Sequence, residues 1–217
     1  MRGAEAGFLQ GSILCCHASQ DSIRRTAMKV LMINGSPRKR GNTQALLGAA
    51  AKEIKGRGID VDQISLAELR VEPCTGCMAC SDKPLICPIK DDGVKVFKRM
   101  LKADGLLFGS PVYFGGVTAQ LKALFDRSIM VCQKEDLKDK VAGGVTVGGG
   151  AHGGQELALS QMITFFGLHA MRIAVSPVEI LGAAGTGDKK GDVLNDKEGM
   201  ASARSLGKRM ADMLLEK

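Results

Sequence analysis

The sequence is poor in aromatic residues: its 217 residues include no tryptophan and one tyrosine, and aromatics make up 4% of the chain. Proteins that bind single-stranded nucleic acid stack bases on aromatic side chains, and this chain lacks that platform although its net charge is +7. It also has no run of about 18 consecutive apolar residues, the length that a membrane-spanning helix needs. We therefore expect no nucleic-acid partner and no membrane partner.

Cysteine is too scarce for a disulfide-stapled scaffold, in which it exceeds roughly 8–10% of residues. The chain has seven cysteines, and four of them fall between positions 74 and 87. The leading residues do not match a secretory signal. Such a cluster then indicates metal binding or redox chemistry in a reducing compartment, and we expect a cytoplasmic protein.

Residues 1–27 show neither helical nor strand periodicity, and we expect them to be a poorly ordered N-terminal extension of a single domain, residues 28–217. Beyond them, apolar runs of strand length alternate with amphipathic helical patterns. The expected strands are 29–34, 59–66, 105–109, 141–148 and 171–175; the expected helices are 43–55, one that Asp91 or Asp92 caps and that ends at 101, 118–129, 155–166 and 196–215. This alternation predicts an α/β fold, a doubly wound five-stranded parallel sheet in the order 2-1-3-4-5.

The loop after the first strand has the character of an anion site. It reads Gly-Ser-Pro-Arg-Lys-Arg-Gly-Asn-Thr over residues 35–43 and leads directly into a helix, whose N-terminus carries partial positive charge. Ser36, Asn42 and Thr43 add side-chain donors, and Arg38 adds a cation. The loop matches neither the Walker A motif nor Gly-x-Gly-x-x-Gly. It therefore predicts a site for a terminal monophosphate; a polar turn with a solvated basic tip is the alternative.

Two further loops follow strands at the same expected edge of the sheet. Residues 111–115 contain the chain's one tyrosine beside a phenylalanine, which suits a planar heterocycle, although taken alone such a pair more often packs at the edge of a core. Residues 148–154 hold five glycines in seven positions, which lets a ligand approach the backbone closely. A flexible surface loop is the alternative for this second segment.

The cysteine spacing is the sharpest signal in the chain: Cys74-x2-Cys77-x2-Cys80-x6-Cys87, followed by proline. This spacing lets one winding loop surround an iron–sulfur cubane, whereas structural zinc favours two Cys-x2-Cys pairs separated by a longer spacer. Because the chain has no second cysteine set, the spacing predicts one 4Fe-4S cluster. Zinc or free redox thiols are the alternatives.

Taken together, these motifs resemble the iron-sulfur flavoproteins of the NADPH-dependent FMN reductase superfamily, which are flavodoxin-like. The resemblance covers the chain from residue 28 onward. It implies that Ser36, Arg38, Asn42 and Thr43 hold the FMN phosphate, that Pro111, Val112, Tyr113, Phe114 and Gly115 border the isoalloxazine ring, that the glycine run with Gly149 and Gly153 is a third flavin loop, and that Cys74, Cys77, Cys80 and Cys87 ligate a 4Fe-4S cluster.

FMN exchanges one or two electrons and a cluster exchanges one, so the pair interconverts the two kinds of electron transfer. We expect an FMN-dependent oxidoreductase that links a ferredoxin-like donor, or NAD(P)H, to a small-molecule acceptor, with no side chain acting as acid, base or nucleophile. An NAD(P)H-dependent FMN or quinone reductase without a functional cluster and a zinc-stabilised binding module are the alternatives. Because the chain has few aromatics to cover both faces of a flavin, we also expect a homodimer or homotetramer.

Overall fold

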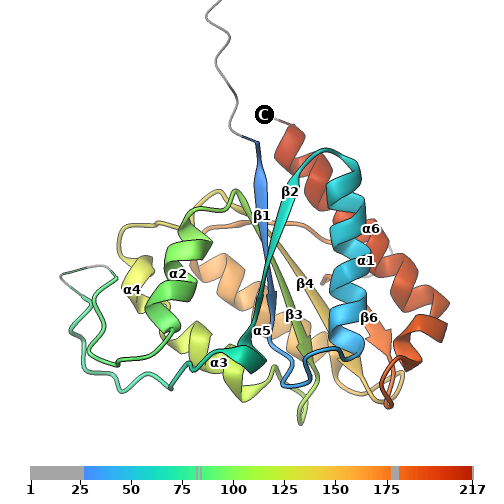
Figure 1. The fold of residues 1–217 in the computed structure, drawn as a ribbon, viewed down its shortest axis with the longest axis horizontal. Helices are drawn as coiled ribbons and strands as arrows, with labels where there is room; N and C mark the ends of the chain where they lie inside the picture. The colour runs from blue at the N-terminus through green and yellow to red at the C-terminus, as the bar shows by residue number, and fades with distance from the viewer. Residues whose placement is uncertain (1–26, 82, 84, 177–180, 217) are drawn as a thin grey trace, which may run out of the picture.

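The computed structural model describes residues 27–81, 83, 85–176 and 181–216, and it is built on one parallel sheet with helices on both faces (Figure 1). The strands are β1 (Lys29–Asn34), β2 (Asp60–Ser65), β3 (Gly105–Pro111), β4 (Val141–Gly148), β5 (Arg172–Ile173) and β6 (Ala183–Thr186). The helices are α1 (Asn42–Gly56), α2 (Gly93–Leu101), α3 (Ala119–Asp126), α4 (Ile129–Cys132), α5 (Gln155–Leu168) and α6 (Lys197–Leu215), with short 3₁₀ turns η1 (Leu66–Glu68) and η2 (Asp192–Asn195). The strand order β2-β1-β3-β4-β5 confirms the predicted fold.

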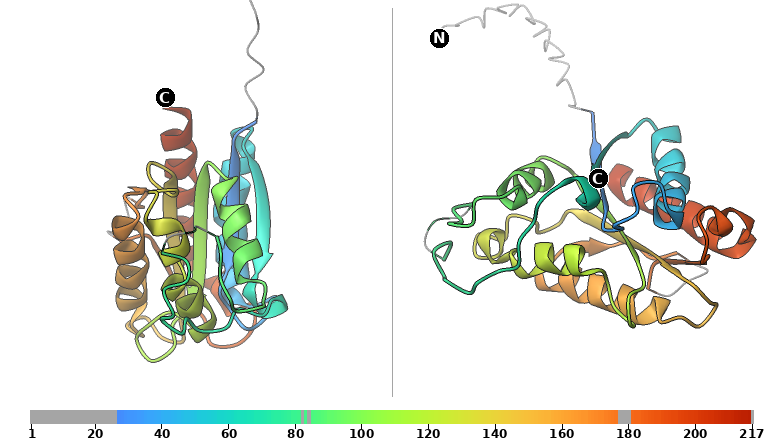
Figure 2. Two further views of the ribbon diagram at one scale, coloured as in Figure 1. Left: turned by 90° about the vertical axis from the view of Figure 1, so that its left-hand side faces the viewer. Right: turned by 60° about the horizontal axis from the view of Figure 1, so that its bottom comes forward.

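A hydrophobic core lies on each face of the sheet. Helices α1 and α6 cover one face, and α2 to α5 cover the other (Figures 1 and 2). Successive residues of β1 alternate between the two cores: Val30 and Met32 lie in one, Leu31 and Ile33 in the other. A strand buried on both faces has no room for polar side chains along its length. Chemistry is therefore confined to the strand ends and the loops.

The fifth position of the sheet differs from the prediction, because two segments share it. The expected strand 171–175 shortens to β5, which pairs with the start of β4, and β6 pairs with the end of β4 from Val145 to Gly148. The sequence analysis missed β6, whose residues Ala-Ala-Gly-Thr have low strand propensity. Pairing with β4, rather than local propensity, makes this segment a strand.

One helix boundary also differs from expectation. The helix expected over 118–129 ends at Asp126, and the short α4 follows after Arg127 and Ser128. The start of α2 agrees with expectation, because Asp92 occupies its N-cap position. The Asp92 side chain accepts a hydrogen bond from the Arg70 amide, whereas Asp91 Oδ1 accepts from the amide of Gly93, the first residue of α2 (2.9 Å).

Of the expected N-terminal extension, all but residue 27 lies outside the described part of the chain. Among the described helices, none combines the length and the apolar character that crossing a membrane requires.

The contact between α1 and α6 provides a test of the packing. A Cβ added at Gly207 of α6 would lie 2.8 Å from the Cα of Ala50, whereas one added at Gly48, on the exposed side of α1, would meet nothing within 4 Å. We expect Gly207→Ala to force the helices apart and lower the free energy of unfolding by about 1–3 kcal/mol. Gly48→Ala should raise it by roughly 0.5–1 kcal/mol, the helix-propensity gain. Denaturant unfolding of both variants measures the difference; equal effects would contradict this packing.

Candidate functional site

A pocket of about 130 Å³ opens at the carboxyl edge of the sheet. Loops after β1, β3, β4 and β6 line it with Ser36, Arg38, Gly41, Asn42, Thr43, Pro111, Val112, Tyr113, Val147, Gly149, Gly187 and Asp188. Eight of the predicted flavin residues thus meet in one place. The other three, Phe114, Gly115 and Gly153, are not among the lining residues.

The N-terminus of α1 gives the pocket its preference for anions. The N-cap residue is Gly41, which has no side chain to cap the helix, and the first turn contains no acidic residue. The free amide groups and the positive end of the helix dipole are therefore available to a ligand. The preceding loop is fixed by its own bonds: the Ser36 amide donates to Asn34 Oδ1 (2.9 Å), and the Arg38 amide donates to Ser36 Oγ (3.1 Å). This arrangement offers preformed donors to an anion, and we name it the phosphate cradle for the ligand that the sequence predicts.

Asn42 holds a neighbouring loop over this cradle. Its side-chain amide donates to the carbonyl oxygens of Gly187 and Lys189 (both 2.9 Å), and its Oδ1 accepts from the amide of Gly191 (2.8 Å). These three bonds engage the side chain that the resemblance assigned to the phosphate. Its contact with phosphate stays a prediction, and its observed role is to position the loop.

Gly187 and Asp188 are pocket residues that the sequence analysis missed. They follow β6, the strand that was also missed, and Arg38 Nη1 donates to the Asp188 carbonyl oxygen (3.4 Å). The polar turn Thr-Gly-Asp at residues 186–188 was the available signal. Without a strand before it, that turn could not be assigned to the carboxyl edge of the sheet.

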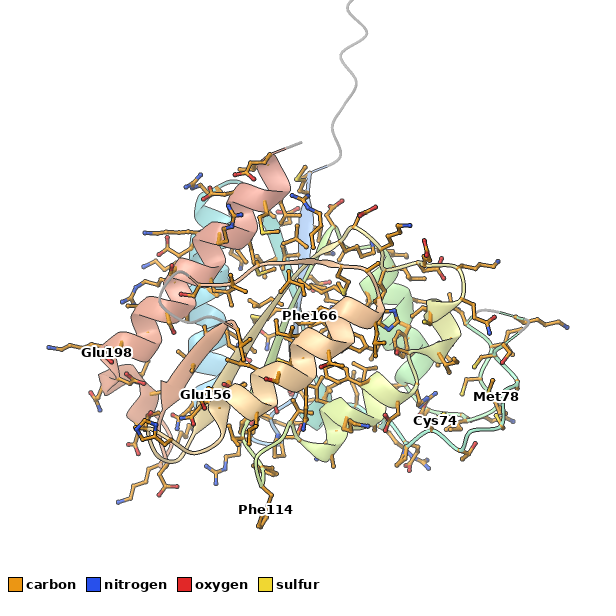
Figure 3. The ribbon with its side chains drawn as sticks, turned by 180° about the vertical axis from the view of Figure 1, so that it is seen from behind. Cys74, Met78, Phe114, Glu156, Phe166 and Glu198 are labelled. Atoms are coloured by element: carbon orange, nitrogen blue, oxygen red, sulfur yellow. The ribbon has the colours of Figure 1, made fainter. Side chains whose placement is uncertain are left out.

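The aromatic loop forms a tight hairpin at the rim of the pocket. The amides and carbonyls of Tyr113 and Gly116 exchange hydrogen bonds of 2.9 and 3.0 Å, and Phe114 and Gly115 between them have φ of 47° and 75°. Positive φ at both central positions defines a type I′ turn, in which phenylalanine is strained. Phe114 is fully exposed and projects from the lower edge of the molecule, whereas Tyr113 lines the pocket (Figure 3). The turn thus presents one ring to the pocket and the other to the surface.

Gln155 organises the glycine loop. Its buried side chain accepts from the amide of Gly153 (2.8 Å) and donates to the carbonyl oxygen of Gly150 (2.7 Å). The loop is therefore held from beneath by the first residue of α5, and Gly149 is left facing the pocket. This role of Gln155 was not predicted from the sequence.

The cysteine loop lies on the side of the molecule occupied by α2 and α4, apart from the Phe114 turn (Figure 3). Cys74 and Cys77 are exposed, while Cys80 and Cys87 are half-buried against the core under α2 to α5. The Gly76 amide donates to Cys74 Sγ (3.4 Å). Hydrogen bonds from the Ala79 amide and the Thr75 hydroxyl lower the pKa of Cys77.

The four thiols lie close enough to influence one another. Burial raises the pKa of Cys80, and the charges of Cys87, Cys74 and Cys77 raise it further. Within the described ranges, however, no three His, Cys, Asp or Glu side chains are arranged to hold a single metal ion. The chemistry of the donor set, four thiols in one loop with amide donors beside them, fits iron–sulfur ligation.

A flavodoxin-like sheet with a helix N-terminus free to accept an anion after β1 and an aromatic turn after β3 is typical of proteins that bind a nucleotide at the carboxyl edge. The chain belongs to the NADPH-dependent FMN reductase family, whose model matches residues 28–180. Together with the relatives below, this confirms the resemblance seen in the sequence and makes the protein an FMN-dependent oxidoreductase.

Two curated relatives are iron-sulfur flavoproteins. The chain is 44% identical over 189 residues to one from Methanocaldococcus jannaschii, covering 86% of this chain and 97% of the relative. It is 36% identical over 188 residues to one from Methanosarcina thermophila, covering 86% and 95%. Among solved structures, the NAD(P)H:quinone oxidoreductase from Methanothermobacter marburgensis shares the fold, with a TM-score of 0.65, 18% identity and coverage of 84% and 96%.

The phosphate cradle predicts a specific dependence on Arg38. We expect Arg38→Ala to weaken FMN binding by about 1.5–3 kcal/mol, the contribution of a charge-assisted hydrogen bond. The matched control is Lys39→Ala, which removes the neighbouring cation that pairs with Glu68 outside the pocket. Fluorescence titration of the apoprotein with FMN measures both affinities. Equal effects, or FAD in place of FMN in the purified protein, would contradict the assignment.

Proposed function

We propose that this chain is an electron-transfer flavoprotein with FMN in the carboxyl-edge pocket and one 4Fe-4S cluster on Cys74, Cys77, Cys80 and Cys87. The observation that carries the proposal is the set of four thiols gathered on one loop with amide donors beside them. Two relatives that are named iron-sulfur flavoproteins support it. All five described cysteines are free, which supports a reducing compartment such as the cytoplasm.

In this proposal the protein supplies position and the cofactors supply redox chemistry. The α1 N-terminus, Ser36, Thr43 and Arg38 hold the phosphate. Tyr113 and the backbone around Gly149 border the remainder of the ligand. Bound FMN exchanges one or two electrons, and no side chain of the pocket is required as acid, base or nucleophile.

Replacing one cluster ligand should separate the two cofactors. We expect Cys77→Ala to lose iron and inorganic sulfide while retaining FMN, because separate loops hold the flavin. Cys132→Ala is the matched control, since Cys132 is a free cysteine outside the loop, and it should retain both. Iron, sulfide and flavin analysis after anaerobic purification measures the outcome. Stoichiometric zinc, or iron and sulfide that persist in Cys77→Ala, would contradict the cluster.

We further propose a ferredoxin-like protein as the one-electron donor. The protein has a basic surface overall, since the chain carries a net charge of +7. Such a surface speeds encounter with an acidic partner in a salt-dependent manner. NAD(P)H is the second candidate, favoured because the chain belongs to the NADPH-dependent FMN reductase family.

Anaerobic flavin reduction distinguishes the two donors. If the cluster is the entry point, reduced ferredoxin should reduce the flavin of the wild type, more slowly as salt is added, and should fail with Cys77→Ala. NADPH should reduce the wild type more slowly than ferredoxin does. Rapid reduction by NADPH that survives loss of the cluster, with no reduction by ferredoxin, would favour a quinone or flavin reductase.

Exposed apolar side chains support self-association. Phe114 is fully exposed. In α5, Leu157, which lies beside Gly115, is 61% exposed, and Leu168 at the end of the helix is 74% exposed. Between α3 and α5 lies a largely apolar hollow of about 410 Å³, lined in part by Phe125 and Phe165. A second copy that covers this face would bury these side chains. It would also cover the rim where Tyr113 and Phe114 lie.

Light scattering tests this proposal. We expect the mass of a dimer or tetramer for the wild type and a smaller mass for Leu157→Glu. Leu194→Glu is the matched control, because Leu194 is equally exposed, at 61%, but lies in η2, which packs against α1 and α6. A wild-type monomer that still holds FMN would overturn the proposal.

A further inference from the structure

A buried ion pair lies beneath the cysteine loop, outside the flavin pocket. Arg127, in the turn between α3 and α4, and Asp91, at the end of the cysteine loop, pair with their side chains 1% and 0% exposed. The second Asp91 oxygen accepts from the Gly93 amide (2.9 Å), and the amide of Glu72 also donates to the carboxylate (2.7 Å). The pair therefore links the two ends of the cysteine loop, at Glu72 and Asp91, to the turn between α3 and α4.

The guanidinium also reaches one of the cysteines. Arg127 Nη2 donates to Cys87 Sγ at 3.4 Å, while Nη1 donates to Asp91 and to the carbonyl oxygen of Glu72 (3.4 Å). Gly93 makes room for this group: a Cβ there would lie 2.6 Å from Arg127 Cζ. The fold thus fixes the guanidinium on three sides and points one N–H at sulfur.

The guanidinium keeps donor capacity to spare. Arg127 Nε is buried and finds no hydrogen-bond partner among the described residues. Buried donors are almost always paired, and an unpaired one of a charged group is especially unfavourable. An iron–sulfur cluster bound at Cys87 would supply sulfur atoms that can accept hydrogen bonds from the guanidinium.

We propose that Arg127 is a positioning residue for the cluster, which holds the Cys87 sulfur by an N–H···S bond and raises the reduction potential of the cluster, while Asp91 sets the strength of this effect from the opposite side. This inference rests on the proposed function, because it requires a cluster at Cys87. Arg127 lies outside the cysteine motif and controls how readily the cluster accepts an electron.

The direction of the effect follows from charge. Reduction adds one negative charge to the cluster, and a cation or N–H donor at a ligand sulfur stabilises the reduced form. A carboxylate behind the guanidinium opposes that stabilisation. Changing Arg127 and changing Asp91 should therefore shift the potential in opposite directions, which a merely structural pair would not do.

Three variants test the proposal by redox titration of the anaerobic holoprotein, with the reduced cluster followed by electron paramagnetic resonance and the FMN midpoint as internal reference. Arg127→Lys keeps a cation to pair with Asp91 but removes the second guanidinium nitrogen, Nη2, which donates to Cys87. Asp91→Asn keeps one side-chain oxygen that can accept from a backbone amide but removes the negative charge that opposes Arg127. Arg70→Met is the control, since Arg70 is an exposed cation near the loop that pairs with Glu72 rather than with a sulfur.

For Arg127→Lys we expect the ratio of reduced to oxidised cluster at fixed ambient potential to fall about tenfold, which is about 59 mV for one electron. Asp91→Asn should shift the ratio upward, and Arg70→Met should leave it unchanged, as should the FMN midpoint in all three. Shifts of the same sign for Arg127→Lys and Asp91→Asn, or no shift in either, would overturn the inference while the cluster stands. Loss of the cluster from both variants would also overturn it, by assigning the pair a structural role. A wild type without iron and sulfide would instead overturn the proposed function, and this inference with it.

Discussion

Parallel pairing of β1, β3 and β4 is the constraint on which the rest of the molecule depends. Parallel strands place their carboxyl ends at one edge, and their burial on both faces excludes polar chemistry from the sheet itself. The loops after these strands therefore converge, although the strands end between 37 and 114 residues apart in the chain. The N-terminus of α1, which has no side-chain cap, lies at the same edge, where its amide groups are free to bind an anion.

The parts of the fold that could be predicted are those with a local signal. The apolar run of β1 and the helix pattern of α1 each carry their own periodicity, and the loop between them joins a strand to a helix in the order that an anion site requires. The cysteine spacing is likewise a local pattern. These features were predicted at nearly their observed boundaries because no distant contact was needed to specify them.

What could not be predicted depends on distant contacts. Asn42 bonds the backbone of residues 187–191, about 145 positions away, and Arg127 reaches Cys87 forty positions back along the chain. In the sequence, Asn42 resembles a ligand donor and Arg127 an ordinary charged residue after a helix. The strand β6 is a similar case, since small residues with little strand propensity pair with β4 only once the sheet exists.

The buried pair of Arg127 and Asp91 is difficult to explain as a device for stability alone. Removing two charges from water is unfavourable, and apolar side chains of similar volume often replace such a pair without loss of stability. Backbone contacts already close the base of the cysteine loop, since the Asp92 amide donates to the Arg70 carbonyl oxygen at 2.9 Å. An apolar pair would leave the amides of Glu72 and Gly93 without their Asp91 acceptor, and it could not direct an N–H group at the Cys87 sulfur. The carboxylate of Asp91 therefore serves the loop by accepting from those amides, whereas Nη2 of Arg127 acts on the cysteine, which is why we assign Arg127 a role at the cluster.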